Sequence, residues 1–227
     1  MIESGAVVLS ILLAFSIDAW WDRYQERARE RDLLRGILAD YRASRSNLEE
    51  RLGLAERMAR NTALLVNLVS ERSEADPISV PDSLILAVMG GPTYEPATNT
   101  LDAALGSGEI ELIRSDEIRA ALAHWRRTLI DTTEDEIEVR RITNEQLVPS
   151  LARVMNLGPY FAQVLNWSFG DPVSGLPGSV VLRASRELAS LLAMRQFYTQ
   201  FAASDLAALL SSLDQVIILL EKELAAE

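Results

Sequence analysis

The chain has 227 residues, 24% of them charged, and its formal net charge at pH 7 is −11. A chain of this length can bury one substantial core, so we expect one soluble body. The acidic balance argues against nucleic acid as a partner, because phosphate binding needs a basic face. The chain has no cysteine, which excludes disulfides, thiolate zinc sites and thiol redox chemistry and fits a reducing compartment.

The first residues predict a membrane anchor. An uncharged apolar run from Ala6 to Ile17 continues through Asp18 to Trp20 and Trp21. The 17 residues of 5–21 reach the lower limit for a helix that spans a hydrocarbon core of roughly 30 Å. Tryptophan favours the boundary between lipid and water, so Trp20 and Trp21 are expected to mark that boundary.

A group of arginines follows the tryptophans, whereas the residues before the run include no lysine or arginine. The positive-inside rule therefore places the C-terminal side of a single-pass protein in the cytoplasm, at a bacterial inner membrane. We expect a transmembrane anchor over 1–22 and a helical soluble domain over 23–227. The residues expected to anchor the helix at the interface are Trp20, Trp21, Arg23 and Arg27; Arg29, Arg31 and Arg35 continue the basic group.

A secretory signal peptide and a buried core helix are the alternatives for this segment. A signal peptide needs a basic start and a small-residue cleavage site, but two tryptophans stand where cleavage would fall. A core helix would explain a short apolar run that contains Asp18, but not the tryptophans and arginines that follow it. Asp18 lies three residues from the expected boundary, where its carboxylate can reach water or headgroups.

Small or polar residues recur every four positions along the anchor. They are Ala6, Ser10, Ala14 and Asp18, and they share one face of a helix. Small residues let helices approach closely in a membrane, so this face predicts docking with another membrane helix, in a homo-oligomer or a larger complex. The alternative is chance, since alanine and serine are common in such helices.

The rest of the chain reads as helices, in chain order. Apolar residues at alternating spacings of three and four predict a helix over 24–72, continuous or nearly so with the anchor and interrupted only by Arg45. Prolines at 77 and 81 end it, and a short helix over 82–89 stops at Gly90. A further helix runs through Leu101 and Leu105 and ends at Gly106 or Gly108.

Ser115 is the expected N-cap of the next helix, and Thr133 with Glu136 suggests a capping box that restarts it. That restarted helix is expected to run toward Met155, bent or ended early by Pro149. The glycine- and proline-rich stretch 156–179 predicts a loop or lid, and a second long helix is expected over 180–224.

The two long helices predict an all-α fold in which they run antiparallel in an elongated bundle continuous with the membrane helix. The apolar run 206–220 is too short for a second span, and Asp214 breaks it. The only candidate strand is 109–113, which is too short to form a stable sheet alone.

Three groups of residues were considered for chemistry. His124 is the only histidine, lacks an orienting carboxylate and a nucleophile at helical spacing, and is expected to be an ordinary, partly buried side chain. The acidic group 131–138 lacks the glycine turn of a calcium loop, so a solvated helix face is expected there. Gly106-Ser107-Gly108 lacks the spacing and the lysine of a phosphate loop. No cofactor, metal or catalytic residue is therefore expected.

Four segments resemble an uncharacterised bacterial family of single-pass membrane proteins with an N-terminal anchor and a helical soluble domain. They are Ile17-Asp18-Ala19-Trp20, the basic helix 27–38, the turn 101–113 and the segment 116–122. The resemblance implies the architecture and carries over no site residue. The tryptophan pair and the stretch before the last helix depart from the family pattern.

These observations lead to a non-enzymatic, membrane-anchored helical interaction protein, an accessory or scaffolding subunit of a respiratory, transport or photosynthetic complex. Its expected partners are other membrane subunits or a second copy through the membrane helix, together with the bilayer. One alternative is a sensor or signalling adaptor whose ligand lies near Tyr94, Trp125, Tyr160 and Trp167. The other is an enzyme with an unrecognised site beneath an aromatic lid.

Overall fold

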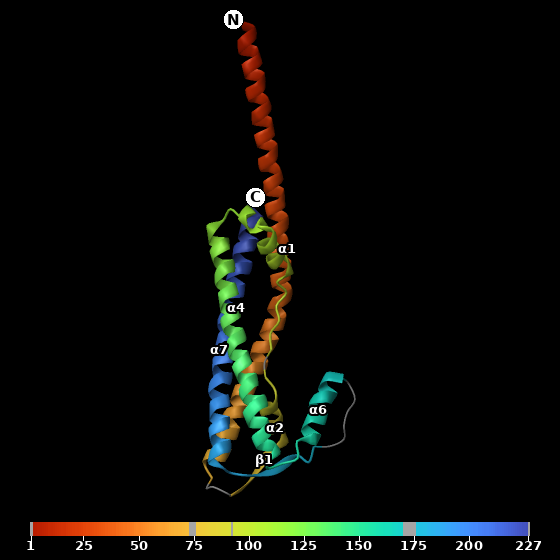
Figure 1. Cartoon of the computed structure of the whole chain (residues 1–227), viewed down its shortest axis with the longest axis vertical. Helices are drawn as coiled ribbons and strands as arrows, with labels where there is room; N and C mark the ends of the chain where they lie inside the picture. The colour runs from red at the N-terminus through yellow and green to blue at the C-terminus, as the bar shows by residue number, and fades with distance from the viewer. Residues whose placement is uncertain (1, 73–75, 92, 170–175, 227) are drawn as a thin grey trace. The chain divides into compact units, whose positions relative to one another are not determined.

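A computed structural model of the chain consists almost entirely of helices. It describes residues 2–72, 76–91, 93–169 and 176–226, and within these ranges it describes side chains over 12–163 and 176–226. The three long helices are α1 (Ile2–Ser70), α4 (Asp116–Ile142) and α7 (Arg186–Ala226). Figure 1 shows these helices, and they confirm the predicted all-α class.

Helix α1 is continuous from the apolar segment to Ser70, as the apolar spacing predicts. The residues expected to face the core are buried, among them Leu34, Tyr41, Leu48, Ala55 and Thr62. The period of 3.6 residues per turn keeps such positions on one face over many turns. Packing along that face, rather than local propensity, therefore stabilises the bundle part of the helix.

The shorter elements occupy the connections between the long helices. They are α2 (Asp82–Met89), α3 (Asn99–Ser107), η1 (Glu109–Leu112), η2 (Thr143–Leu147), α5 (Val148–Ala152) and α6 (Gly158–Phe169). The bounds of α2 and the N-cap of α4 agree with the sequence prediction, since Ser115 Oγ accepts a hydrogen bond from the Ile118 amide at 3.3 Å. Helix α3 ends at Gly108, whose φ of +80° is the left-handed conformation that favours glycine.

Several predicted boundaries are wrong. Helix α4 does not restart at Thr133, whose hydroxyl donates to the Leu129 carbonyl, and Glu136 is buried instead of capping the helix. After Ile142 the helix continues as the π-helical turn η2 and then as α5. The first half of the expected loop 156–179 is α6, which ends at Phe169.

The strand prediction is wrong as well. Residues Glu109–Leu112 form a 3₁₀ turn, and within the described ranges the only sheet pairs β1 (Pro77–Pro81) with β2 (Ser179–Arg183). The strands are antiparallel, with Ile78 opposite Leu182. Both side chains are buried, so this two-stranded sheet is held by the hydrophobic core on one face and not by sheet formation alone.

The chain folds into two compact units. Unit 1 consists of Met1–Arg45, Pro96–His124 and Leu213–Glu227, and unit 2 of Ser46–Glu95 and Trp125–Ser212. Helices α1, α4 and α7 each contribute a segment to both units. The expected boundary at residue 22 between anchor and soluble domain stays a prediction.

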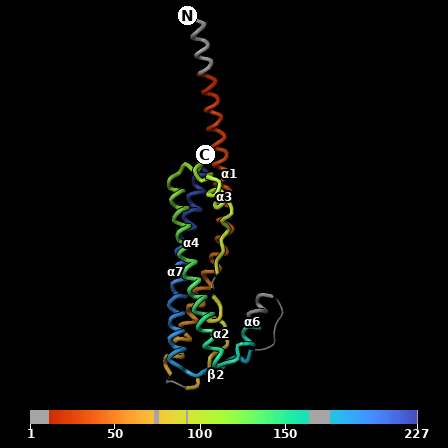
Figure 2. Tube along the Cα trace, in the orientation of Figure 1, coloured from red at the N-terminus to blue at the C-terminus, as the bar shows by residue number. Residues whose placement is uncertain are grey.

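In unit 1, ion pairs link α1 to α7. Arg42 Nη2 lies 2.6 Å from Glu221 Oε1, and Arg45 Nε lies 2.6 Å from Asp214 Oδ1. Arg45 follows Arg42 in α1, but its partner Asp214 precedes Glu221 in α7. The two helices therefore run antiparallel, as Figure 2 also shows. Arg45, the one charged residue in the apolar spacing of α1, is thus explained by Asp214.

Unit 1 also fixes the start of α3 against α1. The Thr100 amide donates to Asp40 Oδ2 at 2.9 Å, and the Ala97 amide donates to Ser44 Oγ at 2.8 Å. A Cβ at Gly36 would lie 2.8 Å from Thr100 Cγ2, which is too close for any larger residue without a shift. Gly36 therefore allows the close approach of α3 to α1.

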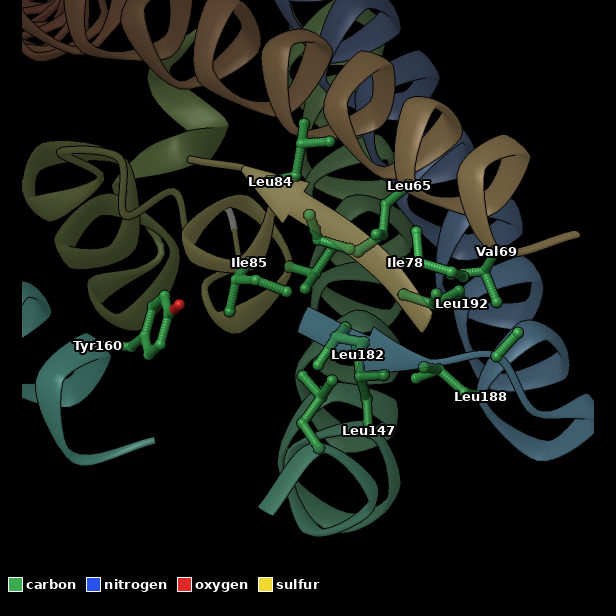
Figure 3. Close-up of a cluster of buried hydrophobic side chains, with 14 of the residues drawn as sticks. Leu65, Val69, Ile78, Leu84, Ile85, Leu147, Tyr160, Leu182, Leu188 and Leu192 are labelled. Carbon is green, nitrogen blue, oxygen red and sulfur yellow. The ribbon is translucent and has the colours of Figure 1, made fainter. Parts of the chain in front are cut away.

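Unit 2 contains a hydrophobic core at the two-stranded sheet (Figure 3). Leu65 and Val69 of α1, Ile85 of α2, Leu182 of β2 and Leu192 of α7 meet there. All five side chains are at most 2% exposed. The core joins segments far apart in the sequence, so packing positions α2, β1 and β2 against the long helices of unit 2.

Arg195 of α7 is fully buried in unit 2. Its Nη2 donates to the carbonyl oxygens of Ala87 (3.2 Å) and Gly90 (2.7 Å) at the C-terminal end of α2. Its Nη1 donates to Thr62 Oγ1 of α1 at 2.6 Å, and its Nε donates to Thr143 Oγ1 of η2 at 3.1 Å. Burial lowers the pKa of Arg195 to about 10, so the guanidinium remains charged at neutral pH.

We predict that Arg195→Met lowers the free energy of unfolding by about 2–4 kcal/mol, because buried carbonyl and hydroxyl groups would lose their hydrogen-bond donor. Arg186→Met, at an exposed arginine of the same helix, is the matched control and should change stability little. Urea unfolding in mild detergent, followed by circular dichroism, measures both. An equal, small effect of the two substitutions would contradict the role assigned to Arg195.

Candidate membrane interface

The described N-terminal part of α1 is apolar and exposed. Leu12, Leu13, Phe15 and Ile17 are 55–67% exposed, and successive positions on a helix point about 100° apart. These side chains therefore cover more than one face of the helix. The first buried residue along α1 is Glu30, so nothing within the described residues covers this apolar surface. In water, so continuous an apolar surface would mark an interaction site.

An aromatic cluster ends the apolar segment. The Tyr24 ring stacks against the rings of Trp20 and Trp21, each with a centroid separation of 5.9 Å. Trp20 and Trp21 are themselves 59% and 51% exposed. Their rings combine a large apolar surface with an N–H donor, the combination that suits the lipid–water boundary.

The arginines expected at the interface follow the two tryptophans in the sequence. Arg23 is exposed, and its Nε donates to the Ala19 carbonyl one turn earlier at 2.9 Å. Side chains of a helix lean toward its N-terminus, so Arg23 reaches back toward the aromatic cluster. Arg27 is also exposed, one turn further along α1.

The structure describes half of the predicted docking face. Ala14 and Asp18 lie one turn apart on α1 and are both exposed. The side chains of Ala6 and Ser10 lie outside the described residues. The docking face therefore stays a prediction.

A pocket of about 640 Å³ lies beside α1 where the helix joins the rest of unit 1. Its floor is fixed by an ion pair, since Arg114 Nε lies 2.6 Å from Glu30 Oε2 and the Arg114 amide donates to Glu30 Oε1 at 2.8 Å. Glu30 is buried, whereas the other charged side chains are exposed. The pocket is lined by Arg23, Glu26, Arg27, Arg29, Glu30, Ser107, Gly108, Glu109, Glu111, Leu112 and Arg114.

Sequence reasoning missed this pocket, because its two walls are about 80 residues apart in the chain. Glu109 and Glu111 belong to η1, which was expected to be a short strand. Arginine and glutamate alternate in α1 at the pocket, and this pattern could have indicated a charged site. Nothing in the sequence, however, indicated that residues 107–114 lie beside it.

Among the described residues, α7 is the one helix long and apolar enough to cross a membrane, with a mean hydropathy of 1.6 over its most apolar stretch. In that stretch 44% of the residues are buried in the fold. Leu206, Leu209, Leu213, Val216 and Leu220 are all fully buried. This burial agrees with the expectation that α7 is apolar because it packs in a bundle.

The other residues considered for chemistry are dispersed. His124 is exposed, which corrects the expectation of partial burial. Within the described ranges, no three histidine, aspartate or glutamate residues are grouped so that they could hold a metal ion. Sequence reasoning missed the contact of Asp205 with Asp135: burial and the hydrogen bond with Asp135 raise the pKa of Asp205 to about 6.

The aromatic residues proposed as a ligand site are core residues where they are described. Tyr94, Trp125 and Tyr160 are at most 5% exposed, and the side chain of Trp167 lies outside the described residues. The Tyr160 hydroxyl donates to Asp82 Oδ1, and burial raises the pKa of Tyr160. These three residues therefore have packing roles that need no ligand.

Glu136 of α4 is a buried carboxyl group in unit 2. Its Oε2 accepts a hydrogen bond from the Tyr94 amide at 3.3 Å, and its Oε1 has no partner among the described residues. Burial raises the pKa of Glu136 to about 7, although the Tyr94 amide, Arg140 and Arg51 act in the opposite direction. The Glu136 carboxyl group is therefore close to half-protonated at neutral pH.

No family model, curated protein or solved structure gives a significant match to this chain.

We predict that Glu136→Gln removes part of the pH dependence of stability. The pKa of Glu136 is about 7 in the folded protein and about 4.5 when unfolded, so the folded state binds the proton more tightly and stability falls as the pH rises from 4.5 through 7. Between pH 5 and pH 8 the free energy of unfolding of the native chain should fall by about 2–3 kcal/mol more than that of the variant. Urea unfolding at both pH values measures the difference.

Glu138→Gln is the control for this prediction. A hydrogen bond from Arg141 lowers the pKa of Glu138, so that carboxylate titrates below the tested pH range and its loss should leave the slope unchanged. An unchanged slope in Glu136→Gln would contradict the assignment of the buried proton to Glu136.

Proposed function

We propose that the chain is a non-enzymatic helical protein held in the bacterial inner membrane by its N-terminal helix, where it acts as an accessory or scaffolding subunit of a larger membrane complex. The observation that carries this proposal is the exposed apolar segment of α1, which ends in an aromatic cluster followed by arginines. A bilayer supplies the apolar surroundings that this segment lacks within unit 1.

The arginine distribution supports an orientation with the bundle in the cytoplasm. Arg23, Arg27 and Arg29 lie within three turns of Trp21, on its C-terminal side. Basic residues close to the end of a membrane helix favour the cytoplasmic side.

The proposal also holds that the chain catalyses no reaction. Two buried ionisable groups of unit 2 act in packing: Arg195 binds the end of α2, and Asp82 accepts a hydrogen bond from Tyr160. Residues used in this way hold the bundle together, which supports a scaffold better than a catalyst.

We predict that the chain spans the membrane once with its bundle in the cytoplasm. Because the chain has no cysteine, single substitutions Ser4→Cys and Glu223→Cys provide unique labelling sites. A membrane-impermeant maleimide applied to intact spheroplasts should label the first cysteine only, and the second should react after lysis. Labelling of both before lysis would contradict the orientation, and recovery of the protein in the soluble fraction would contradict the anchor.

We predict that Ala14→Leu weakens assembly, because a larger side chain on the docking face prevents close helix approach. The measurement is recovery of stoichiometric companions by mass spectrometry after affinity purification from gently solubilised membranes. Removing one close helix contact of about 1 kcal/mol should lower companion recovery roughly fivefold under equilibrium conditions.

Ser16→Leu is the matched control, since it adds similar volume two positions away, on the opposite face of the helix. Equal recovery with both variants would contradict docking through Ala14. Recovery of the native chain without any companion would contradict the role as a subunit of a larger complex.

A further inference from the structure

We propose that the pocket between α1 and η1 binds the headgroup of a zwitterionic phospholipid that carries a phosphate and a primary ammonium, as in phosphatidylethanolamine. This inference rests on the proposed membrane anchoring and specifies which lipid the anchored protein prefers. The pocket has a volume of about 640 Å³, enough for a headgroup and its water.

The position of the pocket along α1 matches the headgroup layer. At a rise of about 1.5 Å per residue, Arg23 lies about 3 Å and Arg27 about 9 Å beyond Trp21 along the helix axis. The headgroup region extends roughly 5–8 Å beyond the hydrocarbon core on each side. If the tryptophans mark the boundary, Arg23 lies within the headgroup layer and Arg27 lies just beyond its outer edge, where its side chain can lean back toward the lipid phosphates.

The pocket presents both signs of charge. Four arginines and four glutamates line it, so the formal charges balance. Glu30 and Arg114 neutralise one another through their ion pair. Within the part of the chain that the structure describes, Arg27, Arg29, Glu109 and Glu111 form no ion pair at 4.0 Å or less, so charges of both signs remain available.

This balance favours a ligand that is itself zwitterionic. A phosphate can take hydrogen bonds from Arg27 or Arg29, and guanidinium groups bind phosphate oxygens in pairs. An anionic headgroup without a cation could pair with the arginines, but it would leave Glu109 and Glu111 without a positive partner and would be repelled by them. A primary ammonium donates three hydrogen bonds to those carboxylates, whereas a choline group donates none.

The experiment is native mass spectrometry of the detergent-solubilised full-length chain with matched phosphatidylethanolamine, phosphatidylcholine and phosphatidylglycerol. We expect phosphatidylethanolamine to be retained roughly threefold more than either other lipid, the effect of about one exposed charge-assisted contact. Glu111→Gln should reduce the preference over phosphatidylcholine, and Arg27→Gln should reduce retention of all three lipids.

Glu134→Gln and Arg127→Gln are the matched controls, because both side chains are exposed and lie outside the pocket lining. They should leave lipid retention unchanged. Equal retention of the three lipids by the native chain would overturn the proposal, as would equal effects of pocket and control substitutions. Binding of inorganic phosphate with no preference among the lipids would also overturn it, by assigning the pocket to free phosphate.

Carbonate extraction of membranes from the same cells separates this inference from the proposed function. A chain that resists extraction but shows no lipid preference is anchored without a headgroup site. A chain released by carbonate has no membrane anchor, and both proposals then fail.

Discussion

Helix α1 has to satisfy two different environments along one continuous backbone. Its described N-terminal part carries large apolar side chains that are more than half exposed, whereas from Glu30 onward it buries one face against the bundle. No break separates the two parts, so the orientation of the apolar segment is fixed by the packing of the helix within unit 1. The ion pairs to α7 and the hydrogen bonds accepted by Asp40 and Ser44 hold the part of α1 that follows the apolar segment. The proposed membrane interface depends on that rigid connection.

Arg195 of unit 2 holds the end of α2 in one position. Hydrophobic packing alone would tolerate small shifts of α2, because its apolar side chains adapt to their surroundings. Arg195 instead requires the carbonyl oxygens of Ala87 and Gly90 within hydrogen-bond distance, together with the hydroxyl groups of α1 and η2. An ordinary carboxylate partner would neutralise the charge but would not position the end of α2. The carbonyl oxygens stabilise the charge and also position the end of α2, since each carbonyl at a helix C-terminus carries partial negative charge.

The sequence allowed the two longest helices, α1 and α7, to be predicted because their apolar spacing repeats over many turns. Leu34, Tyr41 and Leu48 follow one spacing, and a single Arg45 does not hide it. The short elements gave no such signal. Ser179–Arg183 contains valines that suit a strand or a buried helix, and its pairing with Pro77–Pro81 joins segments about 100 residues apart. Glu136 looked like a capping residue because Thr133 precedes it, but the contact with the Tyr94 amide depends on tertiary structure.

One part of the candidate site could likewise be predicted from the sequence, and another part could not. Trp20, Trp21, Arg23 and Arg27 could be identified from local composition, since a membrane anchor is a one-dimensional pattern. The pocket beside them could not, because Glu30 and Arg114 meet only after α3 and η1 have folded back onto α1.

Electrostatic screening connects the pocket to the acidic character of the whole chain. A formal charge of −11 would seem to repel an anionic membrane surface. At physiological ionic strength, however, exposed charges are screened over about 8 Å, the length of roughly five helical residues. A surface at the level of Trp21 therefore interacts mainly with Asp18, Asp22, Arg23, Glu26 and Arg27, whose formal charges sum to only −1. The nearly balanced charge beside the membrane, and not the net charge of the bundle, then determines which headgroups the protein accepts.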